Sequence, residues 1–329
     1  IDLGELGSGC VERLWCHIEL SGRLHQPRLP HGGTNTFPSF LLVCVTVIYI
    51  PLMLCGLIGN ILTILVVVLR PHMRSSTYLY LSSMAVSDLL ILLLLPLDLY
   101  KLWRPRPWPL GDLACKLTMF LSECCTFCTI LHITFLSLER YLAVCWPITA
   151  KTLVTRRRTR TVIGCLWLGA AVSAAPVLIM VGVEDIEFDL RECRCTHYAV
   201  SSGLLSAMMI LSNLYFLIPL CILGLVYSLI GRTLVYQLCH VHKRVIVLAF
   251  VLCWLPFHVG RTIFSFSMGS YFNLVSSVLF YLSAAVNPLL YNLMSARYRR
   301  AVHSLVHTHT RRQRHRLRTI STRHSSTML

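Results

Sequence analysis

Long apolar runs alternate with short polar segments along most of this chain. Runs of membrane-spanning length recur at residues 40–69, 77–99, 113–144, 161–182, 203–230, 245–266 and 271–294. A bilayer core of about 30 Å needs about 20 apolar helical residues, so each run is long enough to cross it. The pattern predicts an all-α membrane protein, a seven-transmembrane helix bundle. The short basic stretch 295–306 adds a predicted amphipathic eighth helix on the inner surface.

The third run carries polar groups at both ends and one acid in its interior. Cys115 and Arg140 are separated by about 25 residues, or roughly 37 Å of helix, so they reach opposite faces of the membrane. Glu123 is the only Asp, Glu, Lys or Arg between Lys116 and Glu139. An ionisable group at that depth is costly, so we interpret Glu123 as a functional residue.

The net charge of +16 is distributed unevenly along the chain. No Asp or Glu follows Glu192, and Arg and Lys concentrate after the first, third, fifth and seventh runs. By the positive-inside rule, the N-terminus is extracellular and the C-terminus is cytoplasmic. Basic segments that alternate with apolar runs are explained by membrane topology, so we expect the lipid bilayer and no nucleic acid as a partner.

Polar residues and prolines interrupt several runs. Pro219, Pro256 and Pro288 each remove a backbone hydrogen bond in mid-membrane and are candidate hinges. Asp88 is a second intramembrane acid, and two interpretations of it stay open: a structural polar node, or a weak sodium or water site.

Two helical faces are predicted to meet in the outer half of the bundle. The sixth run presents a face with spacing i, i+3, i+4, i+7, and the third run presents a similar one. These faces consist of Trp254, Phe257, His258 and Arg261, and of Met119, Glu123, Thr126 and Phe127. Together they predict an aromatic pocket in which Glu123 and Arg261 are less costly as a pair than alone. A purely structural ion pair is the alternative.

Other classes of membrane protein lack support in the sequence. An enzyme would need a catalytic set such as His-Glu-x-x-His, paired aspartates or an activated Ser, and none is present. We therefore expect no enzyme activity, no cofactor and no resident metal ion. A transporter usually shows internal repeats, which are absent here, and it stays a remote alternative.

The motifs, taken in order, resemble those of rhodopsin-like (class A) G-protein-coupled receptors. They are Gly-Asn at 59–60, Leu-x-x-x-Ala-x-Ser-Asp ending at 88, Glu-Arg-Tyr at 139–141, Trp167, Pro219 with Tyr227, Cys-Trp-Leu-Pro at 253–256 and Asn-Pro-x-x-Tyr at 287–291. Segments such as 96–103, 192–194, 253–261 and 280–288 look like the ghrelin and motilin receptor pair. The segments 131–145 and 153–158 lean toward motilin.

The resemblance implies roles for individual residues. Ligand binding is expected at Asp98, Met119, Glu123, Phe127, Phe257, His258 and Arg261. Activation and G-protein coupling are expected at Asp88, Glu139, Arg140, Tyr141, Tyr227, Trp254, Pro256, Asn287, Pro288 and Tyr291. The implied partners are a motilin- or ghrelin-like peptide hormone, a heterotrimeric G protein acting through phospholipase C and calcium, and an arrestin-type regulator, all at the plasma membrane.

Disulfide pairing and domain limits complete the expectations. Cys115 and Cys193 both lie on the oxidising side and are expected to pair, although Cys195, Cys10 and Cys16 are also outside and leave other pairings open. Residues 1–38 form the extracellular segment, 39–306 the seven-transmembrane receptor domain including the surface helix, and 307–329 a disordered cytoplasmic tail.

The links on either side of the sixth run are short. Only residues 235–242 separate the fifth run from the sixth, and 265–271 separate the sixth from the seventh. A coupling-defective or truncated receptor variant is therefore the alternative function. Since no acid follows Glu192, Arg140 has no carboxylate on the sixth helix to pair with, and we expect appreciable signalling without ligand.

Overall fold

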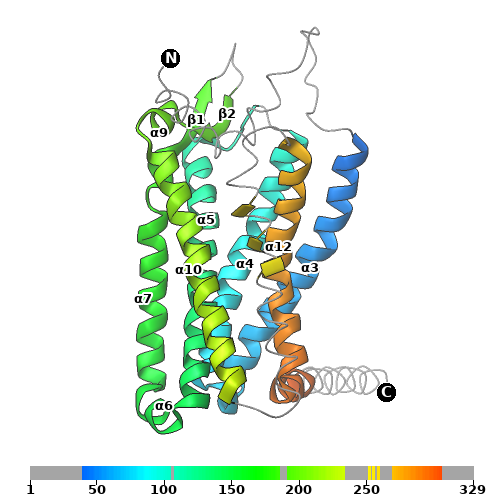
Figure 1. Cartoon of the computed structure of the whole chain (residues 1–329). Coiled ribbons are helices and arrows are strands. Elements are labelled where there is room, and N and C mark those ends of the chain that lie inside the picture. Colours follow the sequence, from blue (N-terminus) through cyan, green and yellow to red (C-terminus); the bar gives the residue numbers. More distant parts are fainter. Residues whose placement is uncertain are drawn as a thin grey trace, which may run out of the picture.

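The protein folds as a bundle of long helices that run side by side (Figure 1). The structure is a computed structural model that describes residues 39–104, 107–185, 191–233, 251–252, 254–255, 258–259 and 269–305. A two-stranded hairpin and α9 (His197–Ser201) lie at one end of the bundle, and α6 (Pro147–Leu153) lies at the other. The predicted all-α membrane fold is confirmed.

Six predicted runs are long helices, and five of them, all but the fourth run, lie close to their expected limits. They are α3 (Ser39–Leu69), α4 (Ser76–Trp103), α5 (Gly111–Cys145), α7 (Arg156–Ala174), α10 (Leu204–Thr233) and α12 (Gly269–Met294). Within the described residues, five helices are long and apolar enough to cross a membrane, the fourth being α7 continued by α8 (Val177–Met180). A shorter apolar segment, Leu274–Pro288, lies within α12. The described parts of the sixth run, 251–252, 254–255 and 258–259, are also helical.

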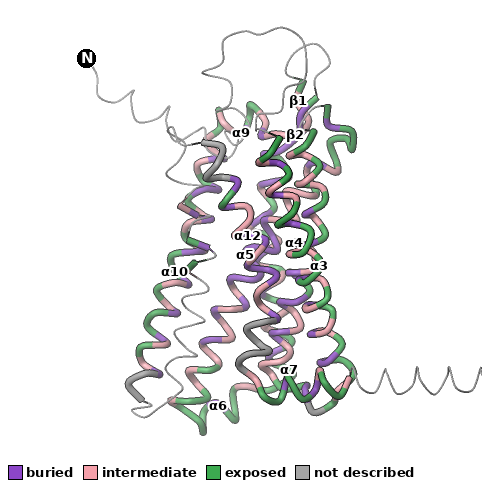
Figure 2. The backbone as a smooth tube through the Cα atoms, turned by 90° about the vertical axis from the view of Figure 1, so that its right-hand side faces the viewer, coloured by how far each residue is buried: buried purple, intermediate pink, exposed green. Residues whose placement is uncertain are grey.

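Burial follows the helix faces (Figure 2). Of the 18 residues that form the most apolar segment of each helix, 56% are buried in α5 and 28% in α3. Helix α5 is therefore the central helix. The outer face of α3 carries exposed large apolar side chains such as Phe40 (78% exposed) and Ile58 (59%). Such an apolar face can contact lipid directly, because the backbone polar groups of the helix are already hydrogen-bonded within it.

Small residues let α3 approach its neighbours. A Cβ atom built on Gly56 would lie 2.7 Å from Leu92 Cδ1, and one on Gly59 would lie 2.9 Å from Pro288 Cβ. Asn60 uses this proximity, since its Nδ2 donates to the Gly56 carbonyl and to the Ala284 carbonyl of α12, each at 3.0 Å. Small side chains and interhelical hydrogen bonds are the usual means of helix association in lipid.

The fourth run ends earlier than predicted, and a hairpin follows it. The α-helix stops at Ala174 and resumes as the single turn α8, and residues 181–182, expected to be helical, belong to a strand. Strand β1 (Val181–Asp185) pairs antiparallel with β2 (Arg191–Cys195), with Val183 opposite Cys193. Neither strand was predicted, and neither were α6 and α9.

Residues 296–305 form the predicted helix after α12. Its apolar side packs on α3 and on the 3-10 turn η1 (Pro71–Met73), where Val66, Met73, Tyr298 and Ala301 form a buried cluster. The Tyr298 hydroxyl lies 2.8 Å from Thr63 Oγ1. Burial raises the pKa of Tyr298, so this phenol stays protonated at neutral pH.

Candidate functional site

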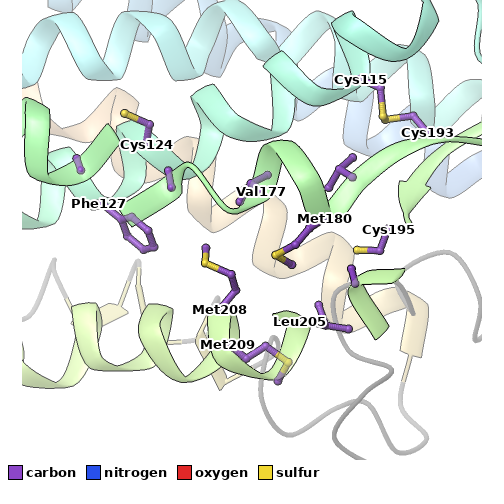
Figure 3. Close-up of a cluster of buried hydrophobic side chains, with 14 of the residues drawn as sticks. Cys115, Cys124, Phe127, Val177, Met180, Cys193, Cys195, Leu205, Met208 and Met209 are labelled. Atoms are coloured by element: carbon purple, nitrogen blue, oxygen red, sulfur yellow. A yellow bond between two sulfur atoms is a disulfide. The ribbon is translucent and has the colours of Figure 1, made fainter. Parts of the chain in front are cut away.

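A buried apolar cluster joins α5, α7, α8, α10 and the hairpin (Figure 3). Phe127 of α5 is fully buried in it and stacks on Tyr215 of α10, with ring centroids 4.2 Å apart. The Tyr215 hydroxyl lies 2.7 Å from Ser173 Oγ of α7. Met119, one of the expected ligand residues, is half-buried against the same cluster. Three helices are therefore joined around the face that was predicted to line the pocket.

Glu123 lies on α5 between Met119 and Phe127 and is 3% exposed. Its carboxylate is thus withdrawn from solvent inside an apolar bundle, where a charge needs a partner or a ligand. Arg261, its expected partner, lies outside the described residues, as do Phe257 and Pro256.

A second buried cluster connects the sixth run with α10 and α12. His258 is 2% exposed and stacks on Phe216 of α10, with centroids 4.6 Å apart. Trp254 lies 6.3 Å from His258 and meets Phe280 of α12 edge to face at 6.0 Å. Trp254 and His258 thus share the inward face that their spacing predicted.

Asp98 lies near the outer end of α4 and is tied to α12. Its Oδ2 accepts a hydrogen bond from the Tyr281 hydroxyl. Tyr281 is 2% exposed and meets Tyr49 edge to face at 5.4 Å and Phe280 at 5.2 Å. A run of aromatic rings therefore connects the Asp98 carboxylate, through Tyr281 and Phe280, to Trp254.

Asp88 lies deeper in the bundle and is 1% exposed. Its Oδ2 accepts a hydrogen bond from Asn287 Nδ2 at 2.9 Å, which joins α4 to α12 just before Pro288. Its Oδ1 is buried without a hydrogen-bond partner among the described residues. Nearby, Ser87 Oγ lies 2.9 Å from Thr129 Oγ1 of α5. Across the described parts of the chain, no group of three or more His, Cys, Asp or Glu is arranged to hold a metal ion.

At the end of the bundle opposite the hairpin, Glu139 is bound by hydroxyl groups. Ser76 Oγ donates to its Oε2 at 2.7 Å, and Thr159 Oγ1 donates to its Oε1 at 3.5 Å. Arg140 is exposed beside it, and Tyr141 is half-buried. Tyr227 of α10 contacts α5 through its hydroxyl, which lies 3.3 Å from Ser137 Oγ.

Tyr291 is the last of the expected coupling residues along the chain. It falls within α12, but its side chain is outside the described part of the structure.

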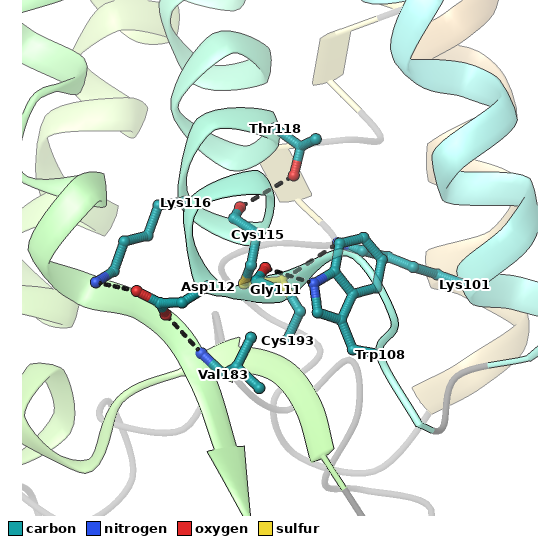
Figure 4. Close-up of a disulfide and its surroundings, with 9 residues drawn as sticks. All are labelled: Lys101, Trp108, Gly111, Asp112, Cys115, Lys116, Thr118, Val183 and Cys193. Atoms are coloured by element: carbon teal, nitrogen blue, oxygen red, sulfur yellow. Dashed lines mark hydrogen bonds and ion pairs between the residues drawn. A yellow bond between two sulfur atoms is a disulfide. The ribbon is translucent and has the colours of Figure 1, made fainter.

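The outer end is cross-linked as expected (Figure 4). Cys115 of α5 and Cys193 of β2 form a disulfide with Cα atoms 5.6 Å apart. Cys195 is a free, buried thiol. Lys101 Nζ lies 5.0 Å from the centre of the Trp108 ring and 3.7 Å from Cys193 Sγ. The Trp108 backbone N–H donates to the Arg191 carbonyl at 2.8 Å, which ties the outer loop to the hairpin.

Several site residues were missed from the sequence. Tyr49, Tyr215, Phe216, Phe280 and Tyr281 all contact predicted site residues through rings or hydroxyls. Each belongs to an apolar run in which aromatic side chains are ordinary, so composition does not single it out. The adjacent pair Phe280 and Tyr281 within an otherwise small-residue stretch of α12 was the available signal.

Comparison with known proteins identifies relatives along most of the chain. Residues 59–291 match the family described as 7 transmembrane receptor (rhodopsin family). The growth hormone secretagogue receptor type 1 of Homo sapiens is 49% identical over 301 residues, covering 82% of each chain, and that of Rattus norvegicus is 48% identical over 308 residues, covering 84% and 85%. The motilin receptor of Homo sapiens is 39% identical over 342 positions, covering 83% and 82%.

These relatives are receptors and not enzymes, in agreement with the sequence prediction. The predicted ghrelin and motilin receptor pair is confirmed. Within that pair, the identity is higher to the growth hormone secretagogue receptors, whereas the segments 131–145 and 153–158 had leaned toward motilin.

Proposed function

Because the chain belongs to the rhodopsin family of seven-transmembrane receptors and to its ghrelin and motilin subfamily, we propose that it is a plasma-membrane receptor for a peptide hormone of that type. Its N-terminus is extracellular and its C-terminus is cytoplasmic. It signals through a heterotrimeric G protein and phospholipase C, which releases calcium, and its phosphorylated tail binds an arrestin-type regulator.

The observation that carries this proposal is the pair of carboxylates in the outer half of the bundle. Glu123 of α5 is 3% exposed, and Asp98 of the neighbouring helix α4 accepts a hydrogen bond from the Tyr281 hydroxyl of α12. Carboxylates in the outer half of the bundle attract a cationic ligand, and the charge of the buried Glu123 is less costly when it is paired. A peptide with a free amino terminus supplies such a cation.

Met119, Phe127, His258 and the undescribed Phe257 and Arg261 complete the proposed ligand site. Phe127 and His258 are buried in aromatic stacks, and these provide apolar surface for a lipid-like or aromatic part of the hormone. Arg261 pairs with Glu123 and divides the peptide pocket, as the family resemblance implies.

Signal transmission is proposed to run through ring contacts and hinges. A ligand that reorganises Phe280 or His258 moves Trp254, which lies in ring contact with both. Pro256 then lets the inner half of the sixth helix swing, while Asn287 and Pro288 adjust α12 beside Asp88. The outcome is a population shift that opens a cytoplasmic surface bounded by Arg140, Tyr227 and Tyr291.

The experiment is intracellular calcium in cells that express the chain, challenged separately with acylated ghrelin and with motilin. A response to either peptide that is absent from mock-transfected cells supports the proposal and identifies the ligand. Labelled-peptide binding without calcium release would favour the coupling-defective variant. If the chain reaches the cell surface but shows no peptide binding and no calcium release, the proposal that it is a receptor for these hormones is rejected.

A further inference from the structure

The β1–β2 hairpin is attached to the outer end of α5 at one rung of its ladder. Cys193 of β2 is bonded covalently to Cys115 of α5. Opposite Cys193, Val183 of β1 donates its backbone N–H to Asp112 Oδ1 at 2.9 Å. One tether thus holds each strand, and both act on the Val183–Cys193 pair (Figure 4).

The two tethers differ in how easily they release. The disulfide is permanent under oxidising conditions, whereas the Asp112 bond is a single hydrogen bond to a carboxylate whose side chain is 50% exposed. The Asp112 bond can therefore open and close while the disulfide keeps the hairpin attached to the bundle.

Asp112 is also held by an ion pair within α5. Its second oxygen, Oδ2, lies 2.6 Å from Lys116 Nζ one turn further along α5. Each carboxylate oxygen therefore has a separate partner, which fixes the direction in which Oδ1 faces the strand. A charged acceptor also makes a stronger hydrogen bond to a backbone N–H than a neutral one does.

The strand approaches Asp112 so closely that a side chain at position 182 would crowd the carboxylate. A Cβ atom on Gly182 would lie 3.1 Å from Asp112 Oδ1 and 3.3 Å from Thr196 Cγ2. The remaining polar contacts of β1 lie further along the strand, where Glu184 accepts from the His197 N–H at 2.8 Å and pairs with Arg194 at 3.2 Å. The backbone of β1 thus packs closely against the Asp112 side chain at Gly182, next to the Val183 hydrogen bond.

We propose that Asp112 is a positioning residue that latches β1 onto α5 and thereby sets how fast a ligand enters and leaves the outer end of the bundle. This inference rests on the proposed function, since it takes the outer half of the bundle as the ligand site. When the latch opens, β1 moves away from the outer end of α5, while the Cys115–Cys193 disulfide keeps β2 attached. When it closes, the hairpin covers the bound peptide.

The test compares Asp112→Ala with Asp112→Asn in the full receptor, using a labelled acylated ghrelin or motilin peptide. Asp112→Ala removes the acceptor, so association and dissociation rates both rise about five- to tenfold, the effect of losing one partly exposed hydrogen bond to a charged group. Equilibrium affinity then changes by less than about threefold, because the latch speeds entry and exit alike and the dissociation constant is the ratio of the two rate constants. Asp112→Asn keeps an oxygen that accepts from Val183 and shifts the rates by less than Asp112→Ala.

Asp185→Asn is the matched control, because it removes another ion pair of the same hairpin. Asp185 pairs with Arg191 at 3.5 Å, and its side chain is 75% exposed. In Asp185→Asn, the association and dissociation rates of the labelled peptide stay within about twofold of those of the unmodified receptor, as expected for a surface ion pair. Gly182→Ala is a second route to the same effect, since it displaces Asp112 Oδ1 without changing any charge.

Hydrogen exchange of the ligand-free receptor separates this inference from the proposed function. Val183 exchanges faster in Asp112→Ala and in Gly182→Ala than in Asp185→Asn, whether or not any peptide binds. If no peptide binds the unmodified receptor, the proposed function fails while faster exchange still establishes the latch. Unchanged peptide kinetics and unchanged exchange in Asp112→Ala, or in Gly182→Ala where the first variant does not reach the surface, would overturn the latch.

Discussion

The Tyr281 hydroxyl of α12 donates a hydrogen bond to Asp98 Oδ2 of α4. The bond fixes the orientation of an outer carboxylate and links it to the ring contacts that lead through Phe280 to Trp254. Asp98 is an exposed residue near the outer end of α4. A ligand cation that binds Asp98 therefore acts on α12 as well as on α4.

Tyr281→Phe is expected to weaken peptide potency. Loss of a hydrogen bond to a charged group costs about 1.5–3 kcal/mol, which is about tenfold or more in the half-maximal concentration for calcium release. Tyr100→Phe is the control, because Tyr100 lies on α4 two residues from Asp98 and is exposed. Equal potency of the Tyr281 and Tyr100 variants would show that Asp98 does not depend on Tyr281.

Ligand-free signalling is expected to exceed that of mock-transfected cells. Arg140 has no acidic partner on the sixth helix, since no Asp or Glu follows Glu192. The closed state therefore relies on contacts such as those of Glu139 with Ser76 and Thr159. Ligand-free signalling is measured as inositol phosphate accumulation without ligand in cells with matched surface expression. Basal output no higher than in mock-transfected cells would contradict it.

Ser76→Ala is expected to raise ligand-free output further. It removes the 2.7 Å hydrogen bond to Glu139 Oε2, so Glu139 is held less firmly against α4. The bond is partly buried and charge-assisted, and its loss of about 1–2 kcal/mol corresponds to an increase of several-fold. Ser75→Ala is the matched control, because the Ser75 side chain caps no backbone group and is exposed. The same assay in both variants decides, and identical outputs would exclude Glu139 as part of the closed state.

Close helix packing predicts a stability difference between two glycines. Gly59→Ala puts a Cβ atom 2.9 Å from Pro288 Cβ, so α3 and α12 must separate, at a cost of about 1–3 kcal/mol. Gly164→Ala on α7 meets nothing within 4 Å, and it stabilises that helix by about 0.5–1 kcal/mol. Thermal unfolding of the purified receptor in detergent measures both. A lower midpoint for Gly164→Ala than for Gly59→Ala would contradict the packing described.

Asp88 allows a test between its two open interpretations, a structural polar node and a weak sodium or water site. Its Oδ1 is buried without a hydrogen-bond partner among the described residues, and a cation or water there would complete it. Replacing sodium by choline in the buffer is expected to raise agonist affinity in the unmodified receptor. In Asp88→Asn, the same exchange of salts has no effect on agonist affinity. Equal salt effects in both proteins would leave Asp88 as a structural polar residue joined to Asn287.

The spanning helices could be predicted from the sequence because lipid leaves few choices. A run of apolar residues such as those of α3 must satisfy its own backbone, and a helix does so within one segment. The inward placement of Trp254 and His258 also followed from their spacing, because residues four apart share a helix face.

The hairpin and the aromatic contacts could not be predicted in the same way. Val181–Asp185 forms a strand because Cys193 and Asp112 hold it against α5, and these contacts join residues far apart in the sequence. The stacking of Phe127 on Tyr215 depends on how α5 and α10 are rotated about their axes. Helix rotation is set by packing against all neighbours together, which a single apolar run does not encode.

The most direct test of the account is saturable binding of labelled acylated ghrelin and motilin to the purified receptor in lipid, with Glu123→Gln measured in parallel. The account predicts saturable binding of at least one peptide to the unmodified protein. It also predicts a loss of about tenfold or more in Glu123→Gln, because the proposed charge pair of Glu123 with Arg261 loses its acidic member. Equal affinity of the two proteins, or no saturable binding of either peptide, would contradict the assignment of Glu123 to a peptide-hormone site.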